Sequence, residues 1–276
     1  MNLTPNYITC HMIGRIGNQM FQIAHAYSQA LTHNRQFVAP LNDTSVHEYR
    51  TNIFRDINFA LDKTDNLENV VRIETPFSFS PTLPSNDKPT IFHGFCQSEK
   101  FFKENIAAIK NLFSPTQEFV QICIANYPEL ASNNVTAINV RRGDYLTQPD
   151  NHPVVTREYI YKALEHIPNK EHIYVISDDM PWCRENINLP NITFVNYTTW
   201  EALWLLTLCK NFVISNSTFS WWGAYLGEKP DSVIVAPETW FGPGVHSRGH
   251  YETDIYQDNW IKVPTYWDNG EIKLKS

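Results

Sequence analysis

Paired cysteines, long apolar runs and a net positive charge are all missing from this sequence, and each absence excludes a class of protein. The 5 cysteines are scattered, with no C-x-x-C pair, at Cys10, Cys96, Cys123, Cys183 and Cys209. This spacing predicts reduced, mostly buried thiols and excludes the common zinc-binding patterns. No apolar run approaches the roughly 20 residues that a transmembrane helix needs.

The N-terminus and the net charge exclude further classes. Residues 1–9 have no basic region and no apolar core, so we expect no signal peptide, no membrane anchor and a cytoplasmic location. The formal net charge of -7 argues against a general binder of nucleic acid or membrane surfaces. An anionic ligand would therefore have to be met by positive charge concentrated at its own site.

What is present is ordinary globular material, with hydrophobic residues at 42% and charged residues at 18%. The length of 276 residues suffices for one large domain or two smaller ones. Aromatic residues make up 13%, and their flat apolar faces and polar edges suit a sugar-binding site as well as a core.

The first half predicts strands and helices around a glycine-containing loop. We expect strands over 7–12, 36–40 and 90–95, and helices over 20–31, 98–112 and 116–127. Residues 42–89 are polar and weakly periodic, which predicts an irregular insertion. Gly14 and Gly17 precede the first helix, a place that suits either an anion or a simple tight turn. Residues 128–134, with Pro, Ser and Asn, are the predicted domain boundary.

The second half alternates strands and helices regularly. Short apolar segments predict strands over 135–140, 172–177, 192–195, 211–215 and 233–236, with helices between them. This order predicts a parallel, Rossmann-like domain from about residue 131 onward. The polar and aromatic tail after Val245 could pack back across the first half.

Two adjacent arginines mark the end of the first strand in this domain. Arg141 and Arg142 follow residues 135–140 directly, and Gly143 and Asp144 come next. Ligands bind at the carboxyl ends of parallel strands, and a guanidinium group matches phosphate oxygens. On these residues alone, two interpretations stay open: a phosphate site, or a structural ion pair such as Arg142 with Asp144.

Polar clusters also follow three other strands of the domain. Asp178 and Asp179 follow the second strand, residues 215–218 the fourth, and Glu238 the fifth. All would line one edge of the sheet, and the combination suits a nucleotide diphosphate held by arginine and helix N-termini. For the two aspartates we favour one helix cap and one ligand-binding carboxylate over a divalent metal site. No P-loop pattern occurs, which argues against phosphoryl transfer from ATP.

Four motifs span most of the chain: Gly14–Gln22, Gly94–Phe102, Asn139–Tyr145 and Ser215–Ala224. Together they resemble the motifs of the α-1,2-fucosyltransferases, glycosyltransferase family 11. The third resembles the family's H-x-R-R-x-D signature but begins with Asn139, where the family usually has His. Because Asn can donate and accept hydrogen bonds, we expect altered donor contacts rather than loss of activity.

The resemblance implies an α/β fold of GT-B type, with two Rossmann-like lobes, parallel sheets and an interlobe cleft. We assign residues 1–130 to an acceptor-side lobe and 131–276 to a lobe that binds GDP-fucose. The implied reaction is an inverting, metal-independent transfer of L-fucose from GDP-fucose to the 2-hydroxyl of a terminal β-galactoside, without a cofactor. The expected partners are GDP-fucose and a galactose-terminated glycan.

The resemblance also implies roles for site residues. We expect Arg141 to stabilise the charge that develops on the β-phosphate, with Arg142 or Asp144 bracing the loop. The proton acceptor is ambiguous between Asp144 and His152, and His152 is equally well interpreted as a surface loop residue. The expected donor-binding residues are Gly14, Arg15, Gly17, Asn18, Gln19, Asn139, Arg142, Asp178, Asp179, Ser215, Asn216, Ser217 and Thr218.

Three alternatives remain at this point. The first is a fucosyltransferase of different linkage or acceptor. The second is a nucleotide-sugar binder without catalysis, which Asn139 keeps open. The third is an adhesive module, because residues 142–144 are an R-G-D tripeptide; it needs secretion and an exposed flexible loop, and the sequence predicts neither.

Overall fold

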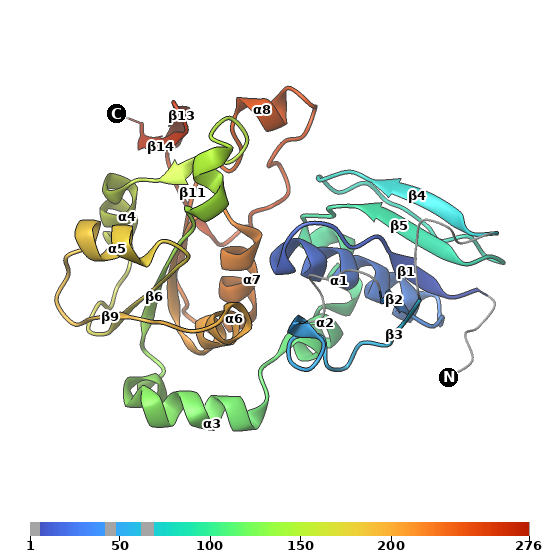
Figure 1. The fold of residues 1–276 in the computed structure, drawn as a ribbon, viewed down its shortest axis with the longest axis horizontal. Helices are drawn as coiled ribbons and strands as arrows, with labels where there is room; N and C mark the ends of the chain where they lie inside the picture. The colour runs from blue at the N-terminus through green and yellow to red at the C-terminus, as the bar shows by residue number, and fades with distance from the viewer. Residues whose placement is uncertain (1–5, 42–47, 62–68, 276) are drawn as a thin grey trace. The chain divides into compact units, whose positions relative to one another are not determined.

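The computed structural model describes residues 6–41, 48–61 and 69–275. The start of the N-terminus, residues 1–5, and two parts of the predicted insertion, 42–47 and 62–68, lie outside the described residues. The chain divides into two compact units (Figure 1). Unit 1 comprises Met1–Ser114 and Glu252–Gln257, and unit 2 comprises Pro115–Tyr251 and Asp258–Ser276.

Unit 1 is built on a parallel sheet of three strands in the order β1-β5-β4, where β1 is Ile8–Cys10, β4 is Val71–Thr75 and β5 is Thr90–Gly94. A separate parallel pair joins β2 (Ala39–Pro40) and β3 (Phe59–Leu61). The expected irregular insertion over 42–89 is therefore wrong where β3 and β4 form. The alternation of apolar and polar residues in Val71–Thr75 does predict a strand, and the surrounding polar residues obscured it.

The helices of unit 1 are α1 (Ile16–Thr32) and α2 (Ile106–Phe113). Helix α1 begins earlier than predicted, because Gly14 adopts φ +78° and turns the chain directly into the helix. The single helix expected over 98–112 is wrong, since two 3₁₀ turns, Glu99–Phe101 and Lys103–Asn105, precede α2. The Asn105 side chain donates to the Ser28 carbonyl and hydroxyl at 3.2 and 2.9 Å, which ties this segment to α1 instead.

Unit 2 is built on six parallel strands in the order β12-β11-β10-β6-β8-β9. The strands are β6 (Thr136–Val140), β8 (Ile173–Ser177), β9 (Ile192–Phe194), β10 (Asn211–Ile214), β11 (Ile234–Pro237) and β12 (Ile261–Val263). The first five confirm the predicted strands. Figure 1 shows helices on both faces of this sheet: α4 (Arg157–Leu164) and α5 (Met180–Asn186) on one, α6 (Thr199–Leu208) and α7 (Thr218–Gly227) on the other.

Helix α3 (Gln117–Asn126) belongs to unit 2 rather than unit 1. Its Phe119 ring lies 5.5 Å from Trp200 and 5.2 Å from Trp204, both on α6. This aromatic packing places the boundary between Ser114 and Pro115, earlier in the chain than the predicted boundary at 130/131.

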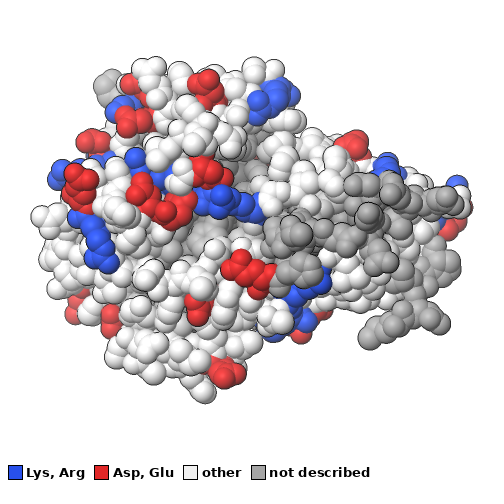
Figure 2. Space-filling model, in the orientation of Figure 1, with Lys and Arg blue, Asp and Glu red and all other residues white. Residues whose placement is uncertain are grey.

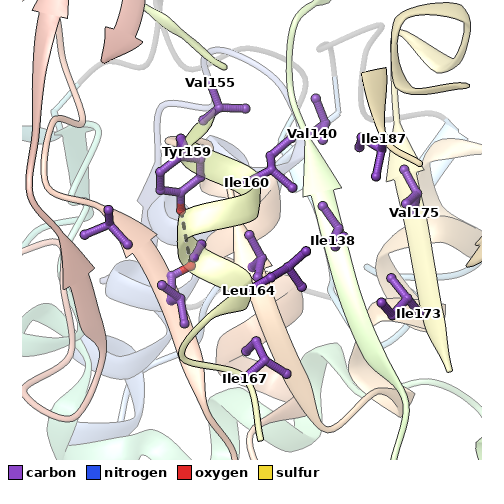
Figure 3. Packing of buried hydrophobic residues seen from close by; sticks show 14 of the residues in the cluster. Ile138, Val140, Val155, Tyr159, Ile160, Leu164, Ile167, Ile173, Val175 and Ile187 are labelled. Carbon is purple, nitrogen blue, oxygen red and sulfur yellow. Dashed lines mark hydrogen bonds between the residues drawn. The ribbon is translucent and has the colours of Figure 1, made fainter. Parts of the chain in front are cut away.

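The core of unit 2 lies between β6 and the helices that cover it. Strand β6 is buried along its whole length because both faces of the sheet are covered. Figure 3 shows Ile138 and Val140 of β6 beside Tyr159 and Ile160 of α4. The Tyr159 hydroxyl donates to the Ile214 carbonyl of β10 at 2.7 Å, so a polar contact fixes α4 across the sheet. The cysteines are all buried and unpaired, which confirms that prediction.

The C-terminal region forms more structure than its composition predicts. Strands β13 (Thr265–Asp268) and β14 (Glu271–Leu274) make a hairpin that extends β7 (Val154–Val155). A short helix, α8 (Pro243–His246), precedes them. Residues Glu252–Gln257 belong to unit 1, where Asp254 accepts from the Phe79 backbone N–H at 2.8 Å and pairs with Lys100.

Candidate active site

The carboxyl ends of three neighbouring strands bring the predicted clusters of unit 2 together. Strand β6 pairs with β10 on one side and with β8 on the other, and Asn139 is in register with both Ile214 and Ile176. The loops that follow these strands, at 141–144, 178–179 and 215–218, therefore lie side by side at one edge of the sheet. This is the edge at which open parallel sheets bind ligands.

Arg141 is held by two carboxylates. One terminal nitrogen lies 2.6 Å from Asp178, and the other donates to Asp144. The guanidinium also lies over the Tyr145 ring, 5.2 Å from its centroid. The side chain is 16% exposed, so a mostly buried cation is fixed at the sheet edge.

Arg142 is held differently. Its Nε lies 3.0 Å from Asp179, and its guanidinium carbon lies 4.2 Å from the Trp182 ring centroid. Its backbone N–H donates to Asp178 at 2.9 Å. Both terminal nitrogens of Arg142 lack a hydrogen-bond partner within residues 6–41, 48–61 and 69–275. The two terminal nitrogens of Arg142 are thus available to a ligand, whereas those of Arg141 each contact a carboxylate.

Of the two aspartates, one is a helix cap as predicted, and the ligand-binding role expected of the other stays a prediction. Asp179 caps α5, where it accepts from the Trp182 backbone N–H at 3.2 Å. Asp178 bridges Arg141 to the Arg142 backbone, and a Cβ at Gly143 would collide with its carboxylate. The predicted ion pair of Arg142 with Asp144 is not formed; Arg141 takes Asp144 instead. On the face of unit 2 drawn in Figure 2, basic and acidic side chains lie next to one another, and neither sign forms a patch of its own.

Asn139 lies inside unit 2, with a 5% exposed side chain. Its amide nitrogen donates to the Ile176 carbonyl at 3.1 Å, and its oxygen accepts from the Ser220 hydroxyl. The residue therefore links β6, β8 and α7 directly beneath the arginines. Its assignment to the donor site stays a prediction.

The loop at 215–218 leads into the N-terminus of α7. Ser215, Asn216 and Ser217 are buried, and Thr218 is the first residue of the helix. The Asn216 side-chain nitrogen donates to the carbonyls of Pro153 and Trp240, each at 2.9 Å, so this loop is tied to two others. Trp221 and Trp222 are fully buried and pack against each other in the core.

His152 stacks on Tyr145, a neighbour that the sequence did not identify. The ring centroids are 4.7 Å apart, and the Tyr145 hydroxyl donates to the Asn216 carbonyl at 3.1 Å. Burial raises the pKa of Tyr145 to about 12 and lowers the pKa of His152, while Asp144 raises the His152 pKa by less. His152 is thus a neutral, mostly buried imidazole near neutral pH and not a solvated surface residue.

The remaining predicted residues lie on unit 1, in the loop before α1. Gly14 and Arg15 are exposed, whereas Gly17 and Gln19 are buried. The Gln19 side chain donates to the Gly14 carbonyl at 3.0 Å, and Asn18 accepts from Gln97 at 3.0 Å. A side chain at position 14 would meet Asn18, so the glycine keeps this turn tight.

The described residues contain neither a metal-binding cluster nor a membrane-spanning helix. No group of three or more His, Cys, Asp or Glu side chains in 6–41, 48–61 and 69–275 could hold a metal ion. Over the same residues, none of the helices combines the length and apolar character required to cross a bilayer.

Comparison with curated proteins gives relatives that match most of this chain. The Escherichia coli O-antigen biosynthesis glycosyltransferase WbnK is 28% identical, covering 91% of this chain and 98% of the relative. An Escherichia coli α-1,2-colitosyltransferase is 25% identical, covering 85% and 92%. The Mus musculus galactoside α-(1,2)-fucosyltransferase 1 is 28% identical, covering 81% of this chain and 64% of that protein.

Solved structures of low sequence identity share the fold. The NodZ α-1,6-fucosyltransferase soaked with GDP-fucose has a TM-score of 0.51 at 11% identity, covering 80% of this chain and 92% of that one. POFUT1 in complex with GDP-fucose has a TM-score of 0.51 at 14% identity, covering 84% and 99%. The α/β fold of GT-B type with parallel sheets is thereby confirmed. The model of glycosyl transferase family 11 matches residues 3–264, so the chain belongs to that family.

Proposed function

We propose that this chain is an inverting α-1,2-fucosyltransferase that moves L-fucose from GDP-fucose to the 2-hydroxyl of a terminal β-galactoside. The observation that carries the proposal is the pair Arg141 and Arg142 at the carboxyl end of β6, fixed by Asp178 and Asp179. Membership of family 11 and the similarity to a galactoside α-(1,2)-fucosyltransferase support the sugar and the linkage.

The arginines retain donors for a diphosphate even though both contact carboxylates. A guanidinium carries five N–H donors, and Arg141 uses only its terminal nitrogens, one on each of two aspartates. Arg142 uses Nε alone and keeps its planar fork for a phosphate. In this proposal Arg142 anchors the diphosphate, and the more rigidly held Arg141 meets the charge that develops during the reaction.

The chemistry needs a fixed positive charge at the leaving group. As the bond from fucose to GDP breaks, the sugar becomes oxocarbenium-like and negative charge grows on the β-phosphate. A preorganised guanidinium stabilises that state more than the ground state, which raises the rate of the chemical step. Two arginines can fill this role without a metal ion, and so we propose metal-independent transfer.

We propose His152 as the base that accepts the proton of the attacking hydroxyl. Its lowered pKa keeps it neutral, which is the form that accepts a proton. Asp144 is the weaker candidate because Arg141 already engages its carboxylate. Attack by the hydroxyl on the face opposite GDP inverts the anomeric carbon.

The test is a transfer assay with GDP-fucose and two acceptors, methyl β-galactoside and its 2-deoxy analogue, each with and without EDTA. We expect a fucosylated product only from the first acceptor, in equal amounts with and without the chelator. Equal use of the 2-deoxy acceptor would exclude the 2-hydroxyl, and loss of product in EDTA would exclude the metal-independent mechanism. Release of GDP with no product from either acceptor would overturn the transferase proposal.

The similarity to an α-1,2-colitosyltransferase favours a second candidate donor. Colitose is fucose without its 3-hydroxyl group, so the two GDP-sugars present the same diphosphate. A site that hydrogen-bonds the 3-hydroxyl would reject colitose strongly, because its polar groups would be left unpaired. Competition between GDP-fucose and GDP-colitose in one reaction gives the ratio of kcat/KM values, and a ratio in favour of colitose would replace fucose as the donor.

A further inference from the structure

One row of polar side chains crosses the carboxyl end of the sheet in unit 1 and has no role in the mechanism above. Glu74 of β4 is in register with His93 of β5, and Cys10 of β1 is in register with Phe92, so that His11 comes next to His93. The row therefore runs Glu74, His93, His11 across three neighbouring strands. It lies at the ligand-binding edge of a parallel sheet.

Contacts within the row fix the His93 ring. Its Nδ1 lies 2.8 Å from a Glu74 carboxylate oxygen, and its ring centroid lies 4.6 Å from that of His11. In the tautomer that donates its Nδ1 proton to Glu74, Nε2 of His93 is a hydrogen-bond acceptor. Neither Nε2 of His93 nor the second oxygen of Glu74 bonds another residue in the described parts of the chain.

Stability gives little reason for this arrangement. The His93 side chain is 40% exposed and that of Glu74 is 80% exposed, and exposed ion pairs contribute little to folding. Directly after the same two strands, Phe77 and Phe95 form a half-buried aromatic pair with centroids 4.7 Å apart. Hydrogen-bond acceptors followed, two or three residues further along the same two segments, by apolar rings are groups that suit a neutral sugar, through its hydroxyls and its C–H face.

We propose that this row is the acceptor-sugar subsite, in which His93 and Glu74 accept hydrogen bonds from hydroxyls of the terminal galactoside. The inference rests on the proposed function, because it takes a galactoside as the ligand. It assigns acceptor recognition to residues of unit 1, whereas the arginines that recognise the diphosphate are on unit 2.

The first test separates acceptor recognition from donor recognition. His93→Phe keeps a ring beside His11 and removes both nitrogens, and Glu74→Gln keeps the size of the side chain and removes its charge. Each should raise KM for the galactoside about tenfold, since one hydrogen bond is lost, and leave KM for GDP-fucose within about twofold. His172→Phe is the matched control, being equally exposed at 40% and 4.0 Å from Glu171. An unchanged galactoside KM in both row variants would overturn the subsite.

The second test measures binding without turnover, by saturation-transfer NMR of methyl β-galactoside in the presence of GDP. We expect a signal from the wild type and from His172→Phe, and its loss from His93→Phe. No signal from the wild type, or an equal signal from His93→Phe, would overturn the subsite. If the wild type transfers no fucose but gives the NMR signal, and His93→Phe loses that signal, the subsite is supported and the proposed function is overturned. The two failures are therefore distinguishable.

Discussion

At the scale of single residues, the sequence identifies the arginines but not what holds them. Arg141 and Arg142 are adjacent at the end of a strand, a position that left a phosphate site and a structural ion pair both open. Their carboxylate partners, Asp178 and Asp179, come from the next strand of the sheet, and only the pairing of β6 with β8 brings them together. The same limit applies to His152, whose stacking on Tyr145 depends on how the loop at 141–152 folds.

Replacement of Arg141 by Ala should lower kcat at saturating GDP-fucose by about 100-fold or more, because a fixed charge at the leaving group is lost. The free energy of unfolding should change by no more than about 1 kcal/mol, since the carboxylates left behind, Asp144 and Asp178, are 36% and 28% exposed and stay solvated. Arg157→Ala is a matched control, because Arg157 also lies 5.2 Å from a tyrosine ring centroid, that of Tyr161, and is exposed. Steady-state kinetics with near-normal kcat for Arg141→Ala would remove Arg141 from the mechanism.

His152 should set the acidic limb of the pH profile. Burial lowers its pKa from the ordinary value of 6.5, so kcat/KM should fall only as the pH drops below 6.5 and the imidazole takes up a proton. His152→Gln should lower kcat about 100-fold and abolish this limb. A pH–rate profile whose acidic limb persists unchanged in the variant would assign that limb to another group.

His25 should make the protein less stable in acid. It is fully buried on α1, and burial lowers its pKa to about 4. The unfolded chain therefore binds a proton that the folded chain does not, and stability present above pH 6.5 is lost as the pH falls toward 4. In urea unfolding, this residue should lower the free energy of unfolding by about 2 kcal/mol between pH 7 and pH 5. His25→Gln should reduce this pH dependence, whatever its effect on stability at pH 7. The control His172→Gln should leave it unchanged. Equal changes of the unfolding free energy with pH in the wild type and His25→Gln would contradict the account.

At the scale of elements, the apolar segments of unit 2 predicted strands correctly, whereas the helical pattern at 98–112 did not give a single helix. The five short apolar segments of unit 2 became β6, β8, β9, β10 and β11, because buried parallel strands are continuously apolar. The segment at 98–112 has a helical pattern, yet the tie from Asn105 to Ser28 breaks it into 3₁₀ turns and α2. Tertiary contacts of this kind leave no trace in local spacing.

Asp179 has two roles, because it caps helix α5 and also contacts Arg142 of the candidate site. Asp179→Ala should destabilise the protein by about 1 kcal/mol through loss of the cap, and it should also weaken GDP binding because Arg142 loses its partner. Thr116 caps α3 in the same way, accepting from the Phe119 N–H at 3.2 Å. Thr116→Ala should match the loss of stability in urea unfolding but bind GDP normally in calorimetry. Equal GDP affinity in Asp179→Ala and Thr116→Ala would show that Asp179 does not contribute to GDP binding.

At the scale of the whole molecule, the motifs predicted the fold class and the family better than they predicted the limits of each unit. The family model covers residues 3–264, in agreement with four motifs spread along the chain. The boundary at Ser114/Pro115 depends on aromatic packing of α3 on α6. The strands after residue 260 were missed because each is short and lies among polar residues. The tail after Val245 was expected to pack back on the first half; Glu252–Gln257 belongs with unit 1, while its flanks belong with unit 2.

The central claim is that this chain forms one particular glycosidic bond, and NMR of the reaction product tests it most directly. After reaction of the purified protein with GDP-fucose and methyl β-galactoside, we expect a through-bond correlation from the fucose anomeric carbon to the 2-position of galactose, with the fucose in the α configuration. Because the donor is β-linked, that configuration also reports inversion. A correlation to any other galactose position, or a β-fucoside, would contradict the account.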